Sequence, residues 1–138
     1  MSFLLDTNAC IAVINGRPEA VRSRLQKALD GGSRVCVSSV AAFELWYGVG
    51  KSSRPEANAR RLPAFFAGPI TVLPFDDEDA RAAGTLRAQL ETVGRPIGAY
   101  DLLIAGQALR RNLILVTADV SDFRRVEGLV WQNWAKQV

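Results

Sequence analysis

Residues 3–8 read FLLDTN, a short apolar run that ends at the carboxylate of Asp6. An apolar run of this length is typical of a buried strand in a parallel sheet, and the residues after Asp6 suit the start of a helix. Ligands of open α/β sheets bind beyond the carboxyl ends of the strands, so the position of Asp6 makes it a candidate site residue. The alternative is that Asp6 only caps the following helix.

Short apolar strands alternate with helical patterns along the rest of the chain. Further strands are predicted at residues 34–38, 70–73, 113–116 and near 129–131. Helices are predicted at residues 8–15, from 18 to the Gly31-Gly32 pair, at 40–47, from 55, at 76–93 and from 99 onwards. Pro63 is expected to bend or end the helix that begins at 55. A polar break is expected at 48–54. The alternation predicts an α/β fold with a mostly parallel central sheet of about four to five short strands, flanked by helices on both faces.

Length and composition fit one globular domain over residues 1–138, since 49% of the residues are hydrophobic and 22% are charged. No apolar run approaches the roughly 18 residues that span a bilayer, and the N-terminus lacks the pattern of a signal peptide. We therefore expect a cytoplasmic protein without a membrane partner. Cys10 and Cys36 fit neither a disulfide framework nor a metal-binding spacing, and we interpret them as core residues.

The charged residues favour a phosphate-bearing partner. The formal net charge is +3, and 14 of the 17 basic residues are Arg, whose planar guanidinium group binds phosphate through two parallel hydrogen bonds. The chain contains no histidine. Acid-base chemistry must therefore come from carboxylates, from a water molecule on a metal ion, or from Lys or Tyr.

Four acidic residues stand at a predicted strand end, in the helix after a strand, or at the start of a helix. They are Asp6, Glu44, Asp101 and Asp119. Right-handed crossovers bring such positions to one end of one sheet. Four carboxylates gathered there repel one another by several kcal/mol even at an effective dielectric constant of about 20, so they require a cation or partial protonation. Oxygen ligands alone favour Mg2+ or Mn2+ over Zn2+.

Glu44 and Asp101 are the most informative of these acids because each interrupts a largely apolar helical stretch. The alternative for each acid is a salt bridge to a basic residue. The acidic run at residues 76–79 is interpreted differently. It stands at a predicted helix start, where the helix dipole favours negative charge, so we expect capping there rather than chemistry.

The order and spacing of several motifs resemble the PIN-domain family. These motifs are LLDTN at residues 4–8, FELWYG at 43–48, PIGAYDLLIA at 96–105 and VTADVSDF at 116–123. The C-terminal stretch from Phe123 to Trp134 is similar to the VapC-type toxins of bacterial toxin-antitoxin pairs. The resemblance covers nearly the whole chain.

This resemblance implies an endoribonuclease that depends on Mg2+ or Mn2+, cleaves structured RNA such as tRNA or rRNA, is inhibited by a VapB-type antitoxin, and forms a homodimer. The acidic set of the family, which binds the metal and catalyses, maps onto Asp6, Glu44, Asp101 and Asp119. One departure is Ala118, where many relatives have Asn or another polar residue. Metal support at this corner must then come from Asp119, Asp122 or Thr117.

The expected reaction is hydrolysis of a phosphodiester bond by a water molecule that the metal activates. Asp119 stands nearer the strand end than Asp122, so we expect Asp119 to contact the ion and Asp122 to act through a water molecule. The hydroxyl groups of Thr7, Ser39 and Thr117 are candidates for supporting the metal ligands or facing the phosphate. Each of them is otherwise a helix cap or a turn residue.

Two alternatives stay open at the sequence level. An enzyme that transfers phosphoryl groups through an aspartyl-phosphate also begins with an Asp at a strand end, but its phosphatase form needs a second Asp where this chain has Asn8. Its receiver form needs an acid pair near the first strand and a late lysine, and the only late lysine is Lys136, a poor match. The other alternative is a catalytically inactive PIN-like binding module. The chain also has more aromatic residues than the core clearly requires, namely Trp46, Tyr47, Phe65 and Phe66. The two alternatives for them are a groove for a partner helix and packing in the core, and core packing is favoured for any single one.

Overall fold

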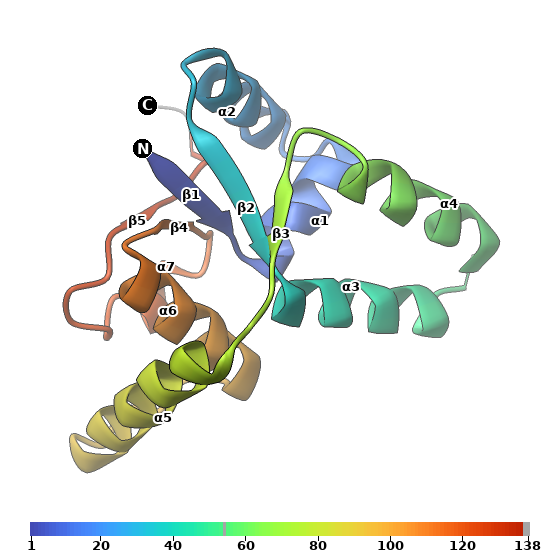
Figure 1. Cartoon of the computed structure of the whole chain (residues 1–138). Helices are drawn as coiled ribbons and strands as arrows, with labels where there is room; N and C mark the ends of the chain where they lie inside the picture. Colours follow the sequence, from blue (N-terminus) through green and yellow to red (C-terminus); the bar gives the residue numbers. More distant parts are fainter. Residues whose placement is uncertain (54, 137–138) are drawn as a thin grey trace.

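The computed structural model describes residues 1–53 and 55–136. In this part of the chain a single five-stranded sheet has the order β3-β2-β1-β4-β5, and every pairing is parallel (Figure 1). The strands are β1 (Ser2–Leu5), β2 (Arg34–Ser38), β3 (Thr71–Leu73), β4 (Ile114–Val116) and β5 (Trp131–Gln132). The prediction of a parallel sheet is confirmed, and the last strand begins slightly later than expected.

Helices cover the sheet on both faces. Leu4 and Leu5 are adjacent in β1 and therefore point to opposite faces, yet both have an exposed fraction of 0%. Each face of the central strand must then be covered. The helices are α1 (Thr7–Asn15), α2 (Glu19–Asp30), α3 (Ser39–Lys51), α4 (Pro55–Phe66), α5 (Asp77–Thr92), α6 (Ala99–Arg111) and α7 (Val120–Phe123). Among the described residues, no helix is long and apolar enough to cross a membrane.

Helices α3 and α4 are longer than the sequence pattern indicates. The polar break expected at residues 48–54 is wrong over its first half, because α3 continues to Lys51, while Arg54 lies outside the described residues. Pro63 does not end α4, which runs on to Phe66. The two helices pack together, with the rings of Trp46 and Phe66 stacked at 6.3 Å. This packing outweighs the cost of roughly 1 kcal/mol for each glycine in a helix.

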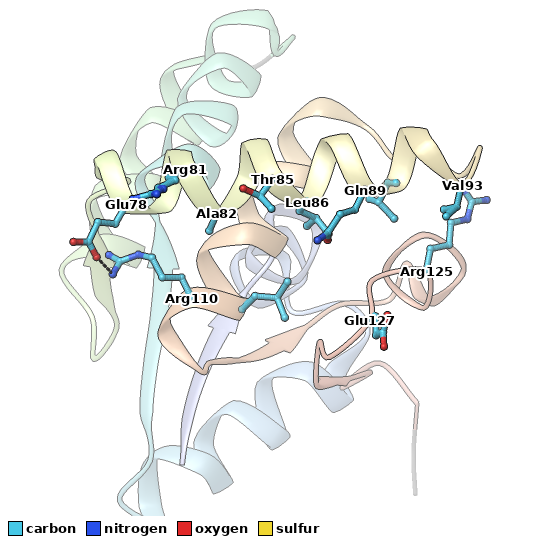
Figure 2. A pocket seen from close by; sticks show the side chains of 12 residues that line it. Glu78, Arg81, Ala82, Thr85, Leu86, Gln89, Val93, Arg110, Arg125 and Glu127 are labelled. Atoms are coloured by element: carbon cyan, nitrogen blue, oxygen red, sulfur yellow. Dashed lines mark hydrogen bonds and ion pairs between the residues drawn. The ribbon is translucent and has the colours of Figure 1, made fainter.

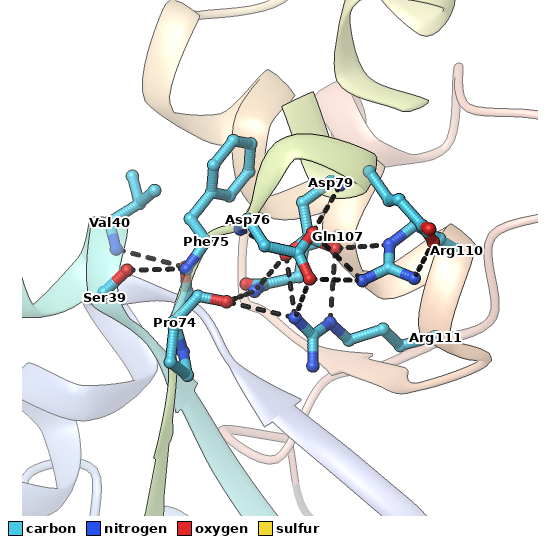
Figure 3. Close-up of polar contacts among 11 residues, drawn as sticks. Ser39, Val40, Pro74, Phe75, Asp76, Asp79, Gln107, Arg110 and Arg111 are labelled. Carbon is cyan, nitrogen blue, oxygen red and sulfur yellow. Dashed lines mark hydrogen bonds and ion pairs between the residues drawn. The ribbon is translucent and has the colours of Figure 1, made fainter. Parts of the chain in front are cut away.

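The acidic run at the start of α5 is a structural anchor, as expected for a cap. Asp76 and Asp79 form a capping box, in which each side chain accepts a hydrogen bond from the backbone of the other. Asp79 has an exposed fraction of 0%, and it also binds Arg110 at 2.7 Å and Arg111 at 2.9 Å (Figure 3). Burial by itself would raise the pKa of Asp79, but these hydrogen bonds hold it well below its usual range.

The ion pairs of Asp79 with Arg110 and Arg111 also fix the position of α6 against α5. Gly106 of α6 lies against Ala83 of α5, so closely that a Cβ atom at position 106 would come within 2.7 Å of the Ala83 Cα atom. The α5–α6 pair is therefore held together by ion pairs at one end and by close backbone packing along its length. The opposite end of α6 carries Asp101.

Candidate metal site

The predicted acids are delivered by the carboxyl ends of three neighbouring strands. Asp6 follows β1, has an exposed fraction of 3%, and accepts a hydrogen bond of 2.8 Å from the Ala9 backbone N–H as the cap of α1. Glu44 lies in α3, after β2, and Asp119 follows β4 directly before α7. Asp101 stands in the first turn of α6, before β4. Capping and site position are thus combined in Asp6 rather than exclusive.

Three carboxylates come close enough to share one ion. Ligand oxygens of Asp101, Asp119 and Asp122 all lie within 4.8 Å of one another, and the three side chains are partly buried. Asp122 is therefore a member of this group together with Asp119, whereas the sequence suggested a more distant position for it. Asp6 and Glu44 lie outside this close group of three.

Electrostatics nevertheless ties all five acids together. Burial, followed by the charges of Asp6, Asp119, Glu44 and Asp122, raises the pKa of Asp101 from 3.8 to about 6. Burial is also the largest cause of a raised pKa at Asp6. The charges of Asp119 and Glu44 raise that pKa further, while hydrogen bonds to the Thr117 side chain and the Ala9 backbone oppose the rise. The neighbouring charges therefore destabilise the ionised forms of Asp6 and Asp101.

The described part of the chain offers these acids little compensating positive charge. Within residues 1–53 and 55–136, no Lys or Arg forms an ion pair with Asp6, Glu44, Asp101 or Asp119. Asp122 has a single distant contact, 3.9 Å from Arg125. The salt-bridge alternative thus finds no support here. A group of oxygen ligands with excess negative charge fits a hard divalent cation.

Two of the three candidate hydroxyls contact the acids. The Thr7 hydroxyl donates a 2.6 Å hydrogen bond to Glu44 Oε1. Thr117 interacts with the side chain of Asp6, and its Oγ1 accepts a 2.9 Å hydrogen bond from the Asp119 backbone N–H. Thr117 thereby joins two acids at the corner where Ala118 supplies no ligand atom.

Two serines near the site have roles that the sequence did not indicate. The Ser39 hydroxyl accepts a 2.9 Å hydrogen bond from the Phe75 backbone N–H, so it joins α3 to the segment before α5 (Figure 3). Sequence reasoning did not consider Ser121, whose hydroxyl donates a 3.2 Å hydrogen bond to Asp119 Oδ1. Ser121 stands two residues after Asp119, at the start of a short helix, and a serine at this spacing can form a local hydrogen bond; this spacing could have indicated the contact.

A large surface hollow lies away from the acid group, and a smaller groove contains only one of the five acids. A hollow of about 890 Å3 lies between α5, α6 and the segment after α7, and its lining mixes Glu78 and Glu127 with Arg81 and Arg125 (Figure 2). None of the five acids lines it. A smaller groove of about 230 Å3 between α1, α3 and α4 is mostly apolar and includes Glu44. Perturbed carboxylates, rather than hollow size, therefore locate the candidate site.

Comparisons with known proteins find similarity over nearly the whole chain. The profile of the PIN domain family matches residues 3–129. The chain is 42% identical over 135 residues to the tRNA(fMet)-specific endonuclease VapC of Shigella flexneri, covering 98% of this chain and 99% of that protein. It is 36% identical over 136 residues to ribonuclease VapC2 of Rickettsia felis, covering 99% of this chain and 100% of that protein.

Solved structures show the same similarity. The VapBC2 complex from Rickettsia felis, bound to a DNA fragment from its promoter, contains a chain that matches with a TM-score of 0.89 and 34% identity, covering 97% of this chain and 99% of that chain. The DNA-bound VapBC complex from Salmonella typhimurium matches with a TM-score of 0.88 and 38% identity, covering 97% of this chain and 98% of that chain.

Proposed function

The chain belongs to the PIN domain family, and from this premise we propose that it is a VapC-type toxin, an endoribonuclease that hydrolyses phosphodiester bonds in structured RNA. The observation that carries the proposal is the group of Asp101, Asp119 and Asp122 at the carboxyl edge of the sheet, with Asp6 and Glu44 beside it. Residues 1–138 act as one PIN-like domain in the cytoplasm, where such RNA is found.

The cofactor is Mg2+ or Mn2+, held by Asp101 and Asp119 with support from Asp6, Glu44 and Asp122. A bound ion of this kind supplies an activated water molecule and neutralises charge on the phosphate. Thr7 restrains the Glu44 carboxylate, and Thr117 restrains Asp6 together with the backbone at Asp119. These contacts orient the ligands, as neighbours of metal-binding side chains generally do.

The accessibility of Asp6 disfavours the aspartyl-phosphate alternative. A carboxylate with an exposed fraction of 3%, already engaged as a helix cap, is poorly placed to attack a phosphoryl group. The inactive binding module is disfavoured by energetics, because five neighbouring carboxylates repel one another, and four of them have no ion pair within residues 1–53 and 55–136. Such a group weakens a fold that binds no ion there. The carboxylates are useful where a bound ion offsets their repulsion.

The partner that controls the activity is a VapB-type antitoxin, as the solved VapBC complexes indicate. The mostly apolar groove between α1, α3 and α4 suits a peptide segment of such a partner, since Ile11, Leu45 and Leu62 line it beside Glu44. A segment bound there would lie next to the acids and obstruct the substrate. The toxin itself forms a homodimer.

The direct test is cleavage of tRNA by the purified chain in Mg2+, with tRNA(fMet) as the first substrate because the Shigella flexneri relative carries that name. Discrete cleavage products are expected, and Asp101→Asn should abolish them while the variant keeps a native circular dichroism spectrum. Adding the protein encoded beside the toxin gene should suppress cleavage. Equal cleavage by the wild type and the variant would show contamination or a different active site.

A further inference from the structure

Two exposed aromatic side chains directly precede two of the acids in sequence. Phe43 and Tyr100 have exposed fractions of 55% and 46%, and their ring centroids lie 5.7 Å apart with an angle of 50° between the planes. They come from different helices, α3 and α6. Each immediately precedes an acid, since Phe43 is followed by Glu44 and Tyr100 by Asp101. The aromatic pair is therefore attached to the same helices that deliver two of the carboxylates.

The pair is not explained by packing of the described chain. Tyr100 and Phe43 contact each other, yet each leaves about half of its surface to solvent. Large aromatic rings contribute most when their faces are covered. Exposed rings beside a candidate active site are thus available to contact what binds there.

The chemistry next to the acids favours a nucleobase as the occupant. A phosphate placed at Asp101 and Glu44 carries its flanking bases with it, and these bases must pass the adjacent side chains. The ion of the proposed function would contact the phosphate and not the flanking bases, so contacts to a base must come from neighbouring side chains, among which Phe43 and Tyr100 are exposed. Stacking on aromatic rings supplies such contacts and tolerates every base, because each base has a π face.

We propose that Phe43 and Tyr100 form a stacking surface for an unpaired base next to the scissile phosphate. The inference rests on the proposed ribonuclease activity and narrows its substrate to unpaired nucleotides, as found in a loop. A base within an A-form stem keeps its faces covered by its neighbours and cannot stack on protein. Because the two rings are tilted and in contact, the base stacks on an outer ring face rather than between them.

The experiment uses a single-stranded oligoribonucleotide with one 2-aminopurine, a base whose fluorescence is quenched on stacking. Binding is measured in Mg2+ with Asp119→Asn as the background, so that the RNA stays intact. Phe43→Leu and Tyr100→Leu remove one ring each while keeping apolar volume, and Phe43→Tyr and Tyr100→Phe are the matched controls that keep the ring. Each Leu variant should lose roughly 5- to 100-fold in affinity and most of the quenching. The controls should resemble the background protein.

Three results would overturn the inference. The Leu variants could bind and quench like the background protein. Alternatively, they could keep RNA affinity and lose affinity for the antitoxin, which would make the pair an antitoxin surface. They could also keep RNA affinity and dissociate in sedimentation, which would make it a dimer contact. Failure of the proposed function is distinct, because the wild type would then quench the probe without cleaving any RNA.

Discussion

Replacing Asp101 by Asn should make the metal-free protein more stable at neutral pH. Burial and the charges of Asp6, Asp119, Glu44 and Asp122 raise the pKa of Asp101 from 3.8 to about 6. Between these two pH values the folded state holds more protons than the unfolded state, so the stability of the wild type falls as the pH rises through this window. A neutral amide removes this loss.

The magnitude follows from the size of the shift. A rise of about two units corresponds to at most about 3 kcal/mol, at about 1.36 kcal/mol for each unit. Asp101 is only partly buried, so screening by water reduces the expected gain to about 1 to 2 kcal/mol. The gain should be present at pH 7, should shrink to a small part of this value by pH 4, and should vanish below 3.8, where the wild-type carboxyl group becomes protonated in both states.

The assay is urea unfolding in EDTA at pH 7 and at pH 4. The control is Glu91→Gln at the exposed far end of α5, where a single 3.3 Å pair with Arg87 predicts a change below about 0.5 kcal/mol. Adding Mg2+ should then stabilise the wild type more than Asp101→Asn, because only the intact group binds the ion well. If Asp101→Asn instead lost stability in EDTA at pH 7, the carboxylate would be held by attraction and our reasoning would be refuted.

Further predictions concern the reaction and the anchor. RNA cleavage should require Mg2+ or Mn2+ and stop in excess EDTA, as followed by gel electrophoresis with the metal content checked. The products should carry 5'-phosphate and 3'-hydroxyl ends, since no histidine is present to activate a ribose hydroxyl, and end-group analysis that found 2',3'-cyclic phosphate would contradict this. Asp119→Asn should nearly abolish the cleavage rate. Asp122→Asn should lower the rate by only about 10- to 100-fold, because the charge of Asp122 is partly balanced by Arg125. Single-turnover kinetics measures both rates, and a larger loss for Asp122→Asn would show that the two roles are exchanged. Asp79→Asn should lower the free energy of unfolding by about 3 kcal/mol at pH 7. This loss should shrink as the pH falls below 3.8, the ordinary pKa of the group. If chemical unfolding showed the same loss at pH 3 as at pH 7, the ion-pair explanation would be excluded.

The sheet and the positions of the acids followed from local patterns. FLLDTN predicts strand, carboxylate and helix in order because each depends on neighbouring residues, and parallel topology then brings Asp6, Glu44 and Asp119 to one edge. The roles of these residues remain predictions. The length of α3 did not follow, because its Gly48 and Gly50 are held helical by packing against α4 rather than by local preference.

Contacts between distant positions were also beyond local patterns. Arg110 and Arg111 lie 31 and 32 residues from Asp79, so neither their role as its partners nor the rigidity they give to α6 can be inferred from spacing. The same holds for the Thr7 contact with Glu44, which spans 37 residues. Sequence patterns identified the acids, whereas the contacts that hold their side chains in place depend on the tertiary structure.

The most direct test of the account is a crystal structure of the chain soaked with Mn2+, because the anomalous signal of manganese locates the ion independently of any activity. The account predicts one strong anomalous peak in direct contact with the carboxylates of Asp101 and Asp119, close to Asp6, Glu44 and Asp122, and no such peak in crystals of Asp101→Asn. A map without a peak at this edge of the sheet at millimolar Mn2+, or with the same peak in the variant, would contradict it.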